Sequence, residues 1–343
     1  MSWNFLNFNN QDILTVGTAT VDIFLKTEIL PNKSEGEGKL CFSLGDKIGA
    51  SSEIFSGGGA TNAAVSFARL GFKTSSFFRI GSDLFGQFIL KDLEKENIIS
   101  YPVKMEKEGT DRSLILISKN GSRVILVSRS KNTFFSKNSF SENGFRPAWA
   151  YLSPGNFPFP FLLSLSEELR KKGTKLAINP SKNLLSLGSK KLKPLFQKMS
   201  VVILNREEAS LLTGIPYGNE RDIFKKFDTL IGGLAVMTDG KKGVSVSDGK
   251  TFWRSGIFKN KKIEDRTGAG DAFGSGFVAG LVRSKESCQK GICGKENIEF
   301  AIRLGSANAT SVVESLGAKS GLLTFKEFNS SRFKNLKIYS KKI

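Results

Sequence analysis

Short apolar runs alternate with segments of helical periodicity through most of this chain. The apolar runs that we expect to be strands are Ile13–Gly17, Thr74–Ile80, Trp149–Leu152, Lys175–Asn179, Val201–Leu204 and Leu234–Thr238. Between the first two runs, Thr61–Leu70 carries apolar residues on one helical face, and Asp83 can cap a helix that ends near Asn97. Strands that alternate with helices are typical of βαβ units and a largely parallel sheet. The pattern therefore predicts an α/β fold.

Two stretches depart from this alternation. Lys39–Phe55 has an extended, partly alternating pattern, and Ser113–Val127 carries two apolar runs on either side of Asn120-Gly121. Asn-Gly between apolar runs is typical of a tight β-hairpin. We expect the two stretches to form a small antiparallel sheet that projects from the main domain. Since no clear linker or internal repeat separates the parts, residues 1–343 are predicted to form a single domain.

The composition excludes several classes of protein. With 343 residues, of which 39% are hydrophobic and 24% charged, the chain can bury a substantial core. No apolar run approaches the roughly 20 residues that span a bilayer, and Met1–Asn10 lacks the pattern of a secretory signal. The three cysteines form no even framework and there is no histidine, so a zinc site is disfavoured. Reduced thiols and a cytoplasmic location are expected.

The net charge of +19 is the property that would suit nucleic-acid binding. The lysines, however, are spread along the chain and form no long basic block with interleaved aromatic residues. This distribution favours a solvated basic surface over specific recognition of nucleic acid. A non-catalytic nucleic-acid-binding protein is therefore only a remote alternative.

The lack of histidine also limits the chemistry, because a general base must then be a carboxylate, a lysine or a tyrosine. Asp271 ends the glycine-rich run Asp265–Asp271 and precedes an apolar helix predicted from Ala272. Glycine-rich backbone at a helix N-terminus exposes unpaired amides that suit a phosphate. Asp271 beside that anion could accept a proton from an attacking hydroxyl. The alternative is an acidic helix cap on a tight turn.

Two further polar elements lie beside predicted strands. Gly57–Gly59 allows a ligand to approach the backbone closely, and Asn62 could hydrogen-bond that ligand; a flexible turn is the alternative. Asn205 and Glu208 follow the strand Val201–Leu204 at the sheet edge where α/β proteins bind ligands. They could orient water around Mg²⁺ or form a capping box, and the two roles are compatible.

Together these elements resemble the ribokinase family, also called the PfkB carbohydrate-kinase family, from about Ile13 to Leu323. Gly57–Gly81 is similar to its N-terminal glycine-rich signature, and Asp265–Asp271 to its Asp-Thr-x-Gly-Ala-Gly-Asp signature. Asn205–Glu208 is similar to its Asn-x-x-Glu element. The resemblance implies a ribokinase-like three-layer α/β/α sandwich with a small β-sheet lid, formed here by approximately residues 24–56 and 101–132.

The resemblance also implies an activity, the ATP-dependent phosphorylation of a hydroxyl of a sugar or nucleoside. Asp271 would be the catalytic base, and the amides of Gly268, Ala269 and Gly270 would form the anion hole. The residues implied for the acceptor are Asp22, Gly58, Gly59 and Asn62, and those implied for ATP are Asn205, Thr238, Gly240, Gly243 and Asn308. Glu208 would hold Mg²⁺ through water. Asp265 and Thr267, with the Gly317–Ser320 stretch, would bind the monovalent cation, such as K⁺, that some members use.

Some positions depart from the family pattern. Arg266 replaces the usual Thr and weakens the case for the monovalent-cation site. Gly59 and Thr20 stand where ribokinase itself has Lys and Asn, so ribose is not an automatic substrate. Because the carboxylate of Asp22 would repel a phosphate, we expect an unphosphorylated sugar or nucleoside; an adenosine kinase or a sugar-phosphate kinase is the alternative. The enzyme is expected to be a monomer or a lid-mediated homodimer.

A dinucleotide-binding oxidoreductase is a competing interpretation of glycine-rich turns in an α/β chain. It requires Gly-x-Gly-x-x-Gly directly after the first strand. Here Gly17 is followed by Thr18-Ala19-Thr20, so that fingerprint is missing.

Overall fold

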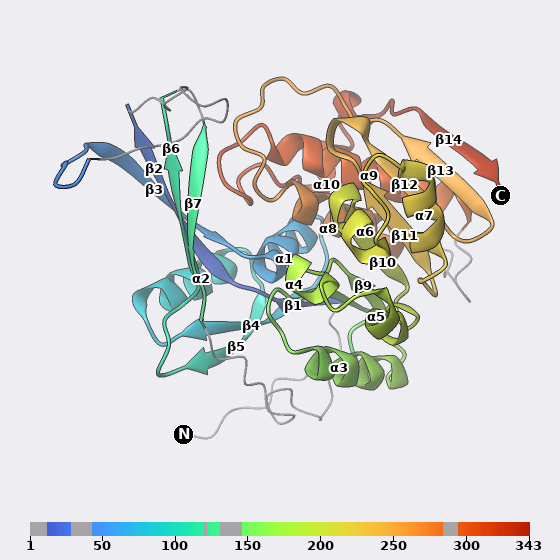
Figure 1. Ribbon diagram of the computed structural model, residues 1–343, viewed down its shortest axis with the longest axis horizontal. Helices are drawn as coiled ribbons and strands as arrows, with labels where there is room; N and C mark the ends of the chain where they lie inside the picture. The colour runs from blue at the N-terminus through green and yellow to red at the C-terminus, as the bar shows by residue number, and fades with distance from the viewer. Residues whose placement is uncertain (1–11, 29–42, 120–121, 131–145, 284–293) are drawn as a thin grey trace.

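The computed structural model describes residues 12–28, 43–119, 122–130, 146–283 and 294–343. Its main sheet has ten strands in the order β5-β4-β1-β8-β9-β10-β11-β12-β13-β14 (Figure 1). The strands are β1 (Ile13–Gly17), β4 (Thr74–Gly81), β5 (Ile99–Met105), β8 (Trp149–Ser153), β9 (Lys175–Ile178), β10 (Val201–Asn205), β11 (Leu234–Thr238), β12 (Val244–Ser247), β13 (Thr251–Ser255) and β14 (Ile338–Lys342). The strands from β5 to β11 are parallel, and β12 to β14 are antiparallel. The predicted α/β fold with a largely parallel sheet is confirmed.

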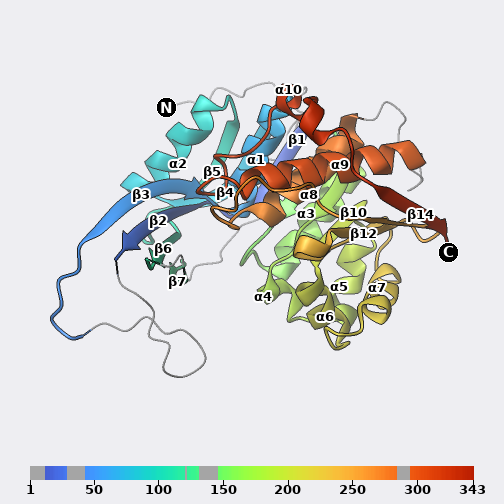
Figure 2. The same cartoon turned by 90° about the horizontal axis from the view of Figure 1, so that it is seen from above.

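Helices cover both faces of this sheet (Figure 2). One layer holds α1 (Gly59–Arg69), α2 (Leu84–Lys95), α8 (Ala269–Arg283), α9 (Lys295–Val312) and α10 (Phe325–Phe328). The other holds α3 (Phe159–Lys171), α4 (Lys182–Leu185), α5 (Ser189–Phe196), α6 (Arg206–Thr213) and α7 (Glu220–Asp228). The described chain contains no helix with the length and apolarity that a bilayer crossing requires.

The strands are apolar throughout because both of their faces are buried. In β10, Val201 and Ile203 pack in the core beneath α8 and α9. Val202 and Leu204 pack in the core on the opposite face. Successive strand residues point to opposite faces of a sheet, so a strand between two helical layers needs a continuous apolar run. This explains why the strands could be predicted from uninterrupted apolar segments.

A second sheet of four strands forms the lid, which stands beside the main sheet in Figure 1. It contains β2 (Thr20–Thr27), β3 (Ala50–Gly57), β6 (Arg112–Ile117) and β7 (Arg123–Ser128), in the order β3-β2-β6-β7. The predicted hairpin is confirmed, because β6 and β7 are antiparallel, with Arg112 opposite Ser128. The lid is not purely antiparallel, since β2 and β6 run parallel.

The predicted lid boundaries need correction. The first lid strand begins at Thr20 and not at residue 24. The second predicted range begins too early, because residues 101–105 belong to β5, which pairs with β4 at the edge of the main sheet. An edge strand is only half covered, so its sequence alternates as a lid strand does. Residues 29–42, 120–121 and 131–132 of the predicted ranges lie outside the described residues.

Candidate active site

The site is built around the N-terminus of α8. Gly268 has a φ of +78°, and a Cβ there would lie 2.4 Å from Ala318 Cβ, so both backbone and packing require glycine. A Cβ at Gly270 would meet no atom within 4 Å, so packing does not require glycine there. Among the described residues, the amides of Gly268 and Gly270 have no hydrogen-bond partner, whereas Ala269 donates a long hydrogen bond of 3.4 Å to the Arg266 carbonyl. Free amides at a helix start suit an anion.

Asp271 lies in the first turn of α8, next to these amides. Asn62 Nδ2 donates a hydrogen bond of 2.9 Å to Asp271 Oδ2 and fixes the carboxylate. Burial raises the pKa of Asp271, the bond from Asn62 lowers it, and the nearby Asp22 carboxylate raises it further. A carboxylate with a raised pKa is a stronger base than one in water, which suits proton abstraction from a hydroxyl.

Asp22 lies on the lid strand β2 and is 9% exposed. Burial raises the pKa of Asp22. A hydrogen bond with Ser113 and the positive charges of Arg129 and Lys319 lower it, but they do not cancel the effect of burial. A Cβ at Gly57 would lie 2.5 Å from Asp22 Oδ2, so glycine lets β3 pass directly beside the carboxylate. The structure therefore brings Asp22 and Asp271 to one site, although the sequence separates them widely.

The glycines before α1 act mainly through close packing. Gly58 has a φ of +99°, and a Cβ there would lie 2.5 Å from the Thr18 carbonyl oxygen. A Cβ at Gly59 would lie 1.9 Å from Ser153 Oγ and 3.4 Å from Asp271 Oδ1. The two ends of the Asn62 amide differ. Its Nδ2 holds Asp271, whereas its buried Oδ1 has no hydrogen-bond partner among the described residues. A hydrogen-bond acceptor is thus left unused directly beside Asp271.

A cavity of about 380 Å³ adjoins the start of α8. It brings together the predicted ATP residues Asn205, Thr238, Gly240 and Gly243 with Ala269 and Gly270. Sequence reasoning missed its apolar wall, which consists of Ile257, Ile263, Phe273, Ala309 and Val313. A polar end with free amides and an apolar end are the arrangement that a nucleotide with its phosphates and its base requires.

The structure does not bring Asn308 to this cavity. Asn308 is fully buried, and its Nδ2 donates hydrogen bonds to Ser66 Oγ and the Ala272 carbonyl, each at 2.9 Å. Its Oδ1 accepts the Leu323 amide at 3.0 Å. This position does not fit the role predicted for Asn308 beside the nucleotide, because the face of α9 that lines the cavity carries positions 306, 309, 310 and 313 instead. Asn308 ties α1, α8 and α9 together beneath Asp271.

Asn205 and Glu208 form the predicted capping box. Asn205 Oδ1 accepts the Glu208 amide at 2.8 Å, and Glu208 Oε2 accepts the Asn205 amide at 2.9 Å. Burial raises the pKa of Glu208. The bond from Asn205 and the charge of Lys182 lower it, whereas Glu207 and Asp271 raise it. Glu208 Oε1 has no hydrogen-bond partner in the described part of the chain, so the cap leaves one carboxylate oxygen free.

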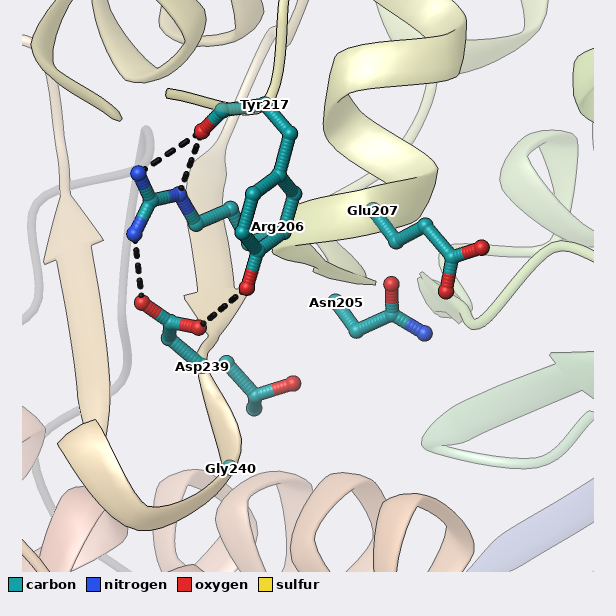
Figure 3. A pocket seen from close by; sticks show the side chains of 7 residues that line it. Asn205, Arg206, Glu207, Tyr217, Asp239 and Gly240 are labelled. Atoms are coloured by element: carbon teal, nitrogen blue, oxygen red, sulfur yellow. Dashed lines mark hydrogen bonds and ion pairs between the residues drawn. The ribbon is translucent and has the colours of Figure 1, made fainter. Parts of the chain in front are cut away.

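An unpredicted ion-pair network fixes the loop after β11 (Figure 3). Arg206, which is 6% exposed, lies 2.9 Å from Asp239 Oδ2 and donates two hydrogen bonds to the Tyr217 carbonyl. The Tyr217 hydroxyl donates to the other Asp239 oxygen at 3.1 Å. These residues line a cavity of about 570 Å³ that shares Asn205, Thr238 and Gly240 with the smaller one. The network therefore positions the loop that borders the candidate nucleotide site.

Asp265 and Thr267, the residues predicted for the monovalent cation, contact each other and both contact an arginine of the lid. Arg123 Nη1 lies 2.5 Å from Asp265 Oδ1 and 3.2 Å from the Thr267 hydroxyl. Asp265 also accepts the Thr267 amide at 3.0 Å and the Gly317 amide at 3.4 Å. No motif of the sequence pointed to Arg123, which lies 142 positions from its partner.

Comparison with known proteins adds three findings. The model of the pfkB family carbohydrate kinases matches residues 10–324. A ribokinase of Haemophilus influenzae is 28% identical over 293 residues, which are 81% of this chain and 88% of that protein. Two solved structures have the same fold. Ribokinase of Arabidopsis thaliana complexed with ribose and ATP has a TM-score of 0.74 at 20% identity and covers 92% of this chain and 97% of its own. Adenosine kinase of Sinorhizobium meliloti has a TM-score of 0.73 at 20% identity and covers 94% and 100%.

Proposed function

This chain belongs to the pfkB family of carbohydrate kinases and is an ATP-dependent kinase of sugars or nucleosides, and we propose that its acceptor is unphosphorylated and binds between Asp22 and Asp271. The observation that carries this proposal is the position of Asp271. Its carboxylate is held by Asn62 and stands at the start of α8, where the amides of Gly268 and Gly270 are free and Gly270 borders a nucleotide-sized cavity.

In the proposed reaction, Asp271 takes the proton of the acceptor hydroxyl. The hydroxyl oxygen forms a bond to the γ-phosphorus of ATP while the bond from that phosphorus to the β-phosphate oxygen breaks. The amides of Gly268 and Gly270 and the positive end of α8 stabilise the charge on the transferred group. ADP and the phosphorylated acceptor are the products. Phosphoryl transfer depends on positioning and charge neutralisation, so a protein without histidine is well able to catalyse it.

The family uses ATP with a divalent metal ion, and we propose that Mg²⁺ fills this role. Glu208 fits it, because its free Oε1 belongs to a carboxylate whose raised pKa disfavours the charged form unless a cation lies nearby. Carboxylate and water oxygens are the ligands that Mg²⁺ prefers in phosphate-transfer sites. When bound, the ion neutralises charge on the ATP phosphates.

Glu208→Gln is expected to raise the free Mg²⁺ concentration for half-maximal rate by about 10-fold, as loss of an outer-shell carboxylate usually does. The melting temperature should change little, because a glutamine Oε1 can still accept the Asn205 amide. Activity measured against free Mg²⁺ tests this. Glu207→Gln is the matched control, since Glu207 is exposed and pairs with Lys182. If the dependence of the rate on Mg²⁺ is the same in Glu208→Gln and the wild type, the role of Glu208 is limited to capping α6.

A sugar phosphate is the second candidate acceptor, and one observation favours it. Arg129, at the end of the lid, lines a cavity of about 500 Å³ with Asn156 and Asn183. Its charge also acts on Asp22, so a phosphate turned toward Arg129 would lie within reach of the same site.

An acceptor panel tests the proposed acceptor class. ADP formation from MgATP would be measured with ribose, adenosine, other nucleosides, fructose and fructose 6-phosphate. We expect turnover of at least one unphosphorylated compound. Turnover of sugar phosphates alone would overturn the acceptor proposal while leaving the kinase activity intact.

We also propose that two lids pair into a homodimer. Strands β3 and β7 are the two edges of the lid sheet among the described residues. The edge at β7 is apolar, because its Val124, Ile125, Leu126 and Val127 are all exposed. An exposed apolar edge strand is a template for pairing with another chain. Light scattering should give the mass of a dimer, and Leu126→Lys should shift the protein toward the monomer. A wild-type mass of one chain at all concentrations would contradict this.

A further inference from the structure

Arg123 lies on the lid face that carries the acceptor carboxylate. Asp22 is opposite Ser113, which is opposite Val127, so these residues share one face of the lid sheet. Arg123 lies four residues before Val127 on the same strand, and side chains two or four residues apart point to the same face. The lid therefore presents Asp22 toward one end of this face and Arg123 toward the other.

Arg123 reaches from this face into the loop of residues 265–270, which we call the anion-hole loop. The side chain of Asp265 is 3% exposed, and that of Arg123 is 37% exposed. A buried carboxylate is strongly unfavourable without a counter-charge. Arg123 provides that counter-charge at 2.5 Å, and its contact with the Thr267 hydroxyl makes the guanidinium bridge two residues of the loop.

The surroundings of Asp265 fit a guanidinium better than an added alkali cation. Its other neighbours are the Thr267 amide, the Thr267 hydroxyl and the Gly317 amide, all of which donate hydrogen bonds to it. In the adjoining stretch, the buried Lys319 turns to other partners, Ser56 Oγ at 2.6 Å and Asp92 at 3.2 Å. One fixed cation, the guanidinium of Arg123, already lies where the sequence predicted a K⁺ site.

We propose that Arg123 takes the place of a monovalent cation beside the anion-hole loop, so that lid closure and not K⁺ organises Gly268–Gly270. The proposal rests on the proposed function of this loop. An acceptor bound to Asp22 would hold the lid in the position in which Arg123 meets Asp265. Because the contact already forms without an acceptor, an acceptor would hold it for more of the time and so order the anion hole further, which favours transfer of the phosphoryl group to the acceptor over transfer to water.

The kinetic test compares the wild type and Arg123→Gln in KCl and in choline chloride at equal ionic strength. The wild type should have the same rate in both salts. Arg123→Gln should lose about 10- to 100-fold in kcat, the usual effect of a mispositioned catalytic group, and added guanidinium chloride should restore part of the rate. Lys26→Gln is the matched control. Lys26 is opposite Ile117, and Ile117 is opposite Arg123, so Lys26 and Arg123 lie in the same row across the lid sheet. Lys26, however, pairs with the exposed Glu53 and not with the anion-hole loop. Lys26→Gln should keep the wild-type rate.

Melting temperatures provide a readout that needs no turnover. The wild type should melt at the same temperature in both salts, and Arg123→Gln should melt about 2–4 °C lower, whereas Lys26→Gln should not. Saturable stimulation or stabilisation of the wild type by K⁺ would overturn the proposal. So would a wild-type rate in Arg123→Gln, or a loss that guanidinium cannot restore. Because the melting measurements do not depend on an acceptor, they separate failure of this inference from failure of the proposed acceptor.

Discussion

Asp271→Asn is expected to lower kcat by about 10²–10⁴-fold while the affinities for ATP and acceptor stay largely unchanged. The asparagine amide cannot take up the proton of the acceptor hydroxyl, but its oxygen can still accept the hydrogen bond that Asn62 now donates to Asp271 Oδ2. Initial rates of ADP formation at saturating ATP and acceptor measure the effect. Near-normal turnover in a folded Asp271→Asn variant would contradict the assignment of Asp271 as the base.

The raised pKa of Asp271 supplies a control for folding. Because burial raises the pKa in the folded state, the charged form is less favourable there than in the unfolded chain, and the variant should not melt at a lower temperature. The same shift predicts the pH profile. A base must be deprotonated, so the acid limb of kcat at saturating acceptor should lie above pH 3.8, the ordinary value for aspartate, and should be absent from Asp271→Asn.

Asp22→Ala is expected to raise the acceptor KM by roughly 10- to 100-fold and to change the KM for ATP little. A carboxylate can accept two hydroxyl hydrogen bonds, and bonds to a charged group contribute about 1.5–3 kcal/mol each. Asp22 lies on the lid and Asn205 and Gly270 line the separate nucleotide cavity, so the two KM values should respond differently.

Glu53→Ala is the matched control for Asp22→Ala. Glu53 is opposite Phe24, one row further along the same lid face, and it pairs with Lys26 on the surface. Its removal should leave both KM values unchanged. An unchanged acceptor KM in Asp22→Ala would show that the lid carboxylate does not hold the substrate.

Much of the main domain could be predicted because its determinants are local. The strand over Val201–Leu204 is a continuous apolar run, as burial on both faces requires, and Asp83 caps α2 by accepting the Gly86 amide at 2.8 Å. The capping box of Asn205 and Glu208 was likewise visible in four consecutive residues. β5 was misassigned because an edge strand has the half-buried pattern of a lid strand.

The contacts across the site could not be predicted, because they join residues that are far apart in the chain. The bond from Asn62 to Asp271 spans 209 positions, and the pair of Arg123 and Asp265 spans 142. Both depend on how the lid and α1 are placed over α8, which no local pattern specifies. Asn308 lies on the helix that lines the cavity but on a different face of it, since a helix turns about 100° per residue.

The central claim is that this enzyme transfers a phosphoryl group from ATP to an acceptor hydroxyl with Asp271 as base. ³¹P NMR of a reaction with ATP, Mg²⁺ and the best acceptor of the panel tests it most directly. The account predicts ADP and a new phosphate ester in equal amounts from the wild type, with neither formed at an appreciable rate by Asp271→Asn. ADP accompanied by inorganic phosphate with every acceptor, or an ester formed as fast by Asp271→Asn, would contradict it.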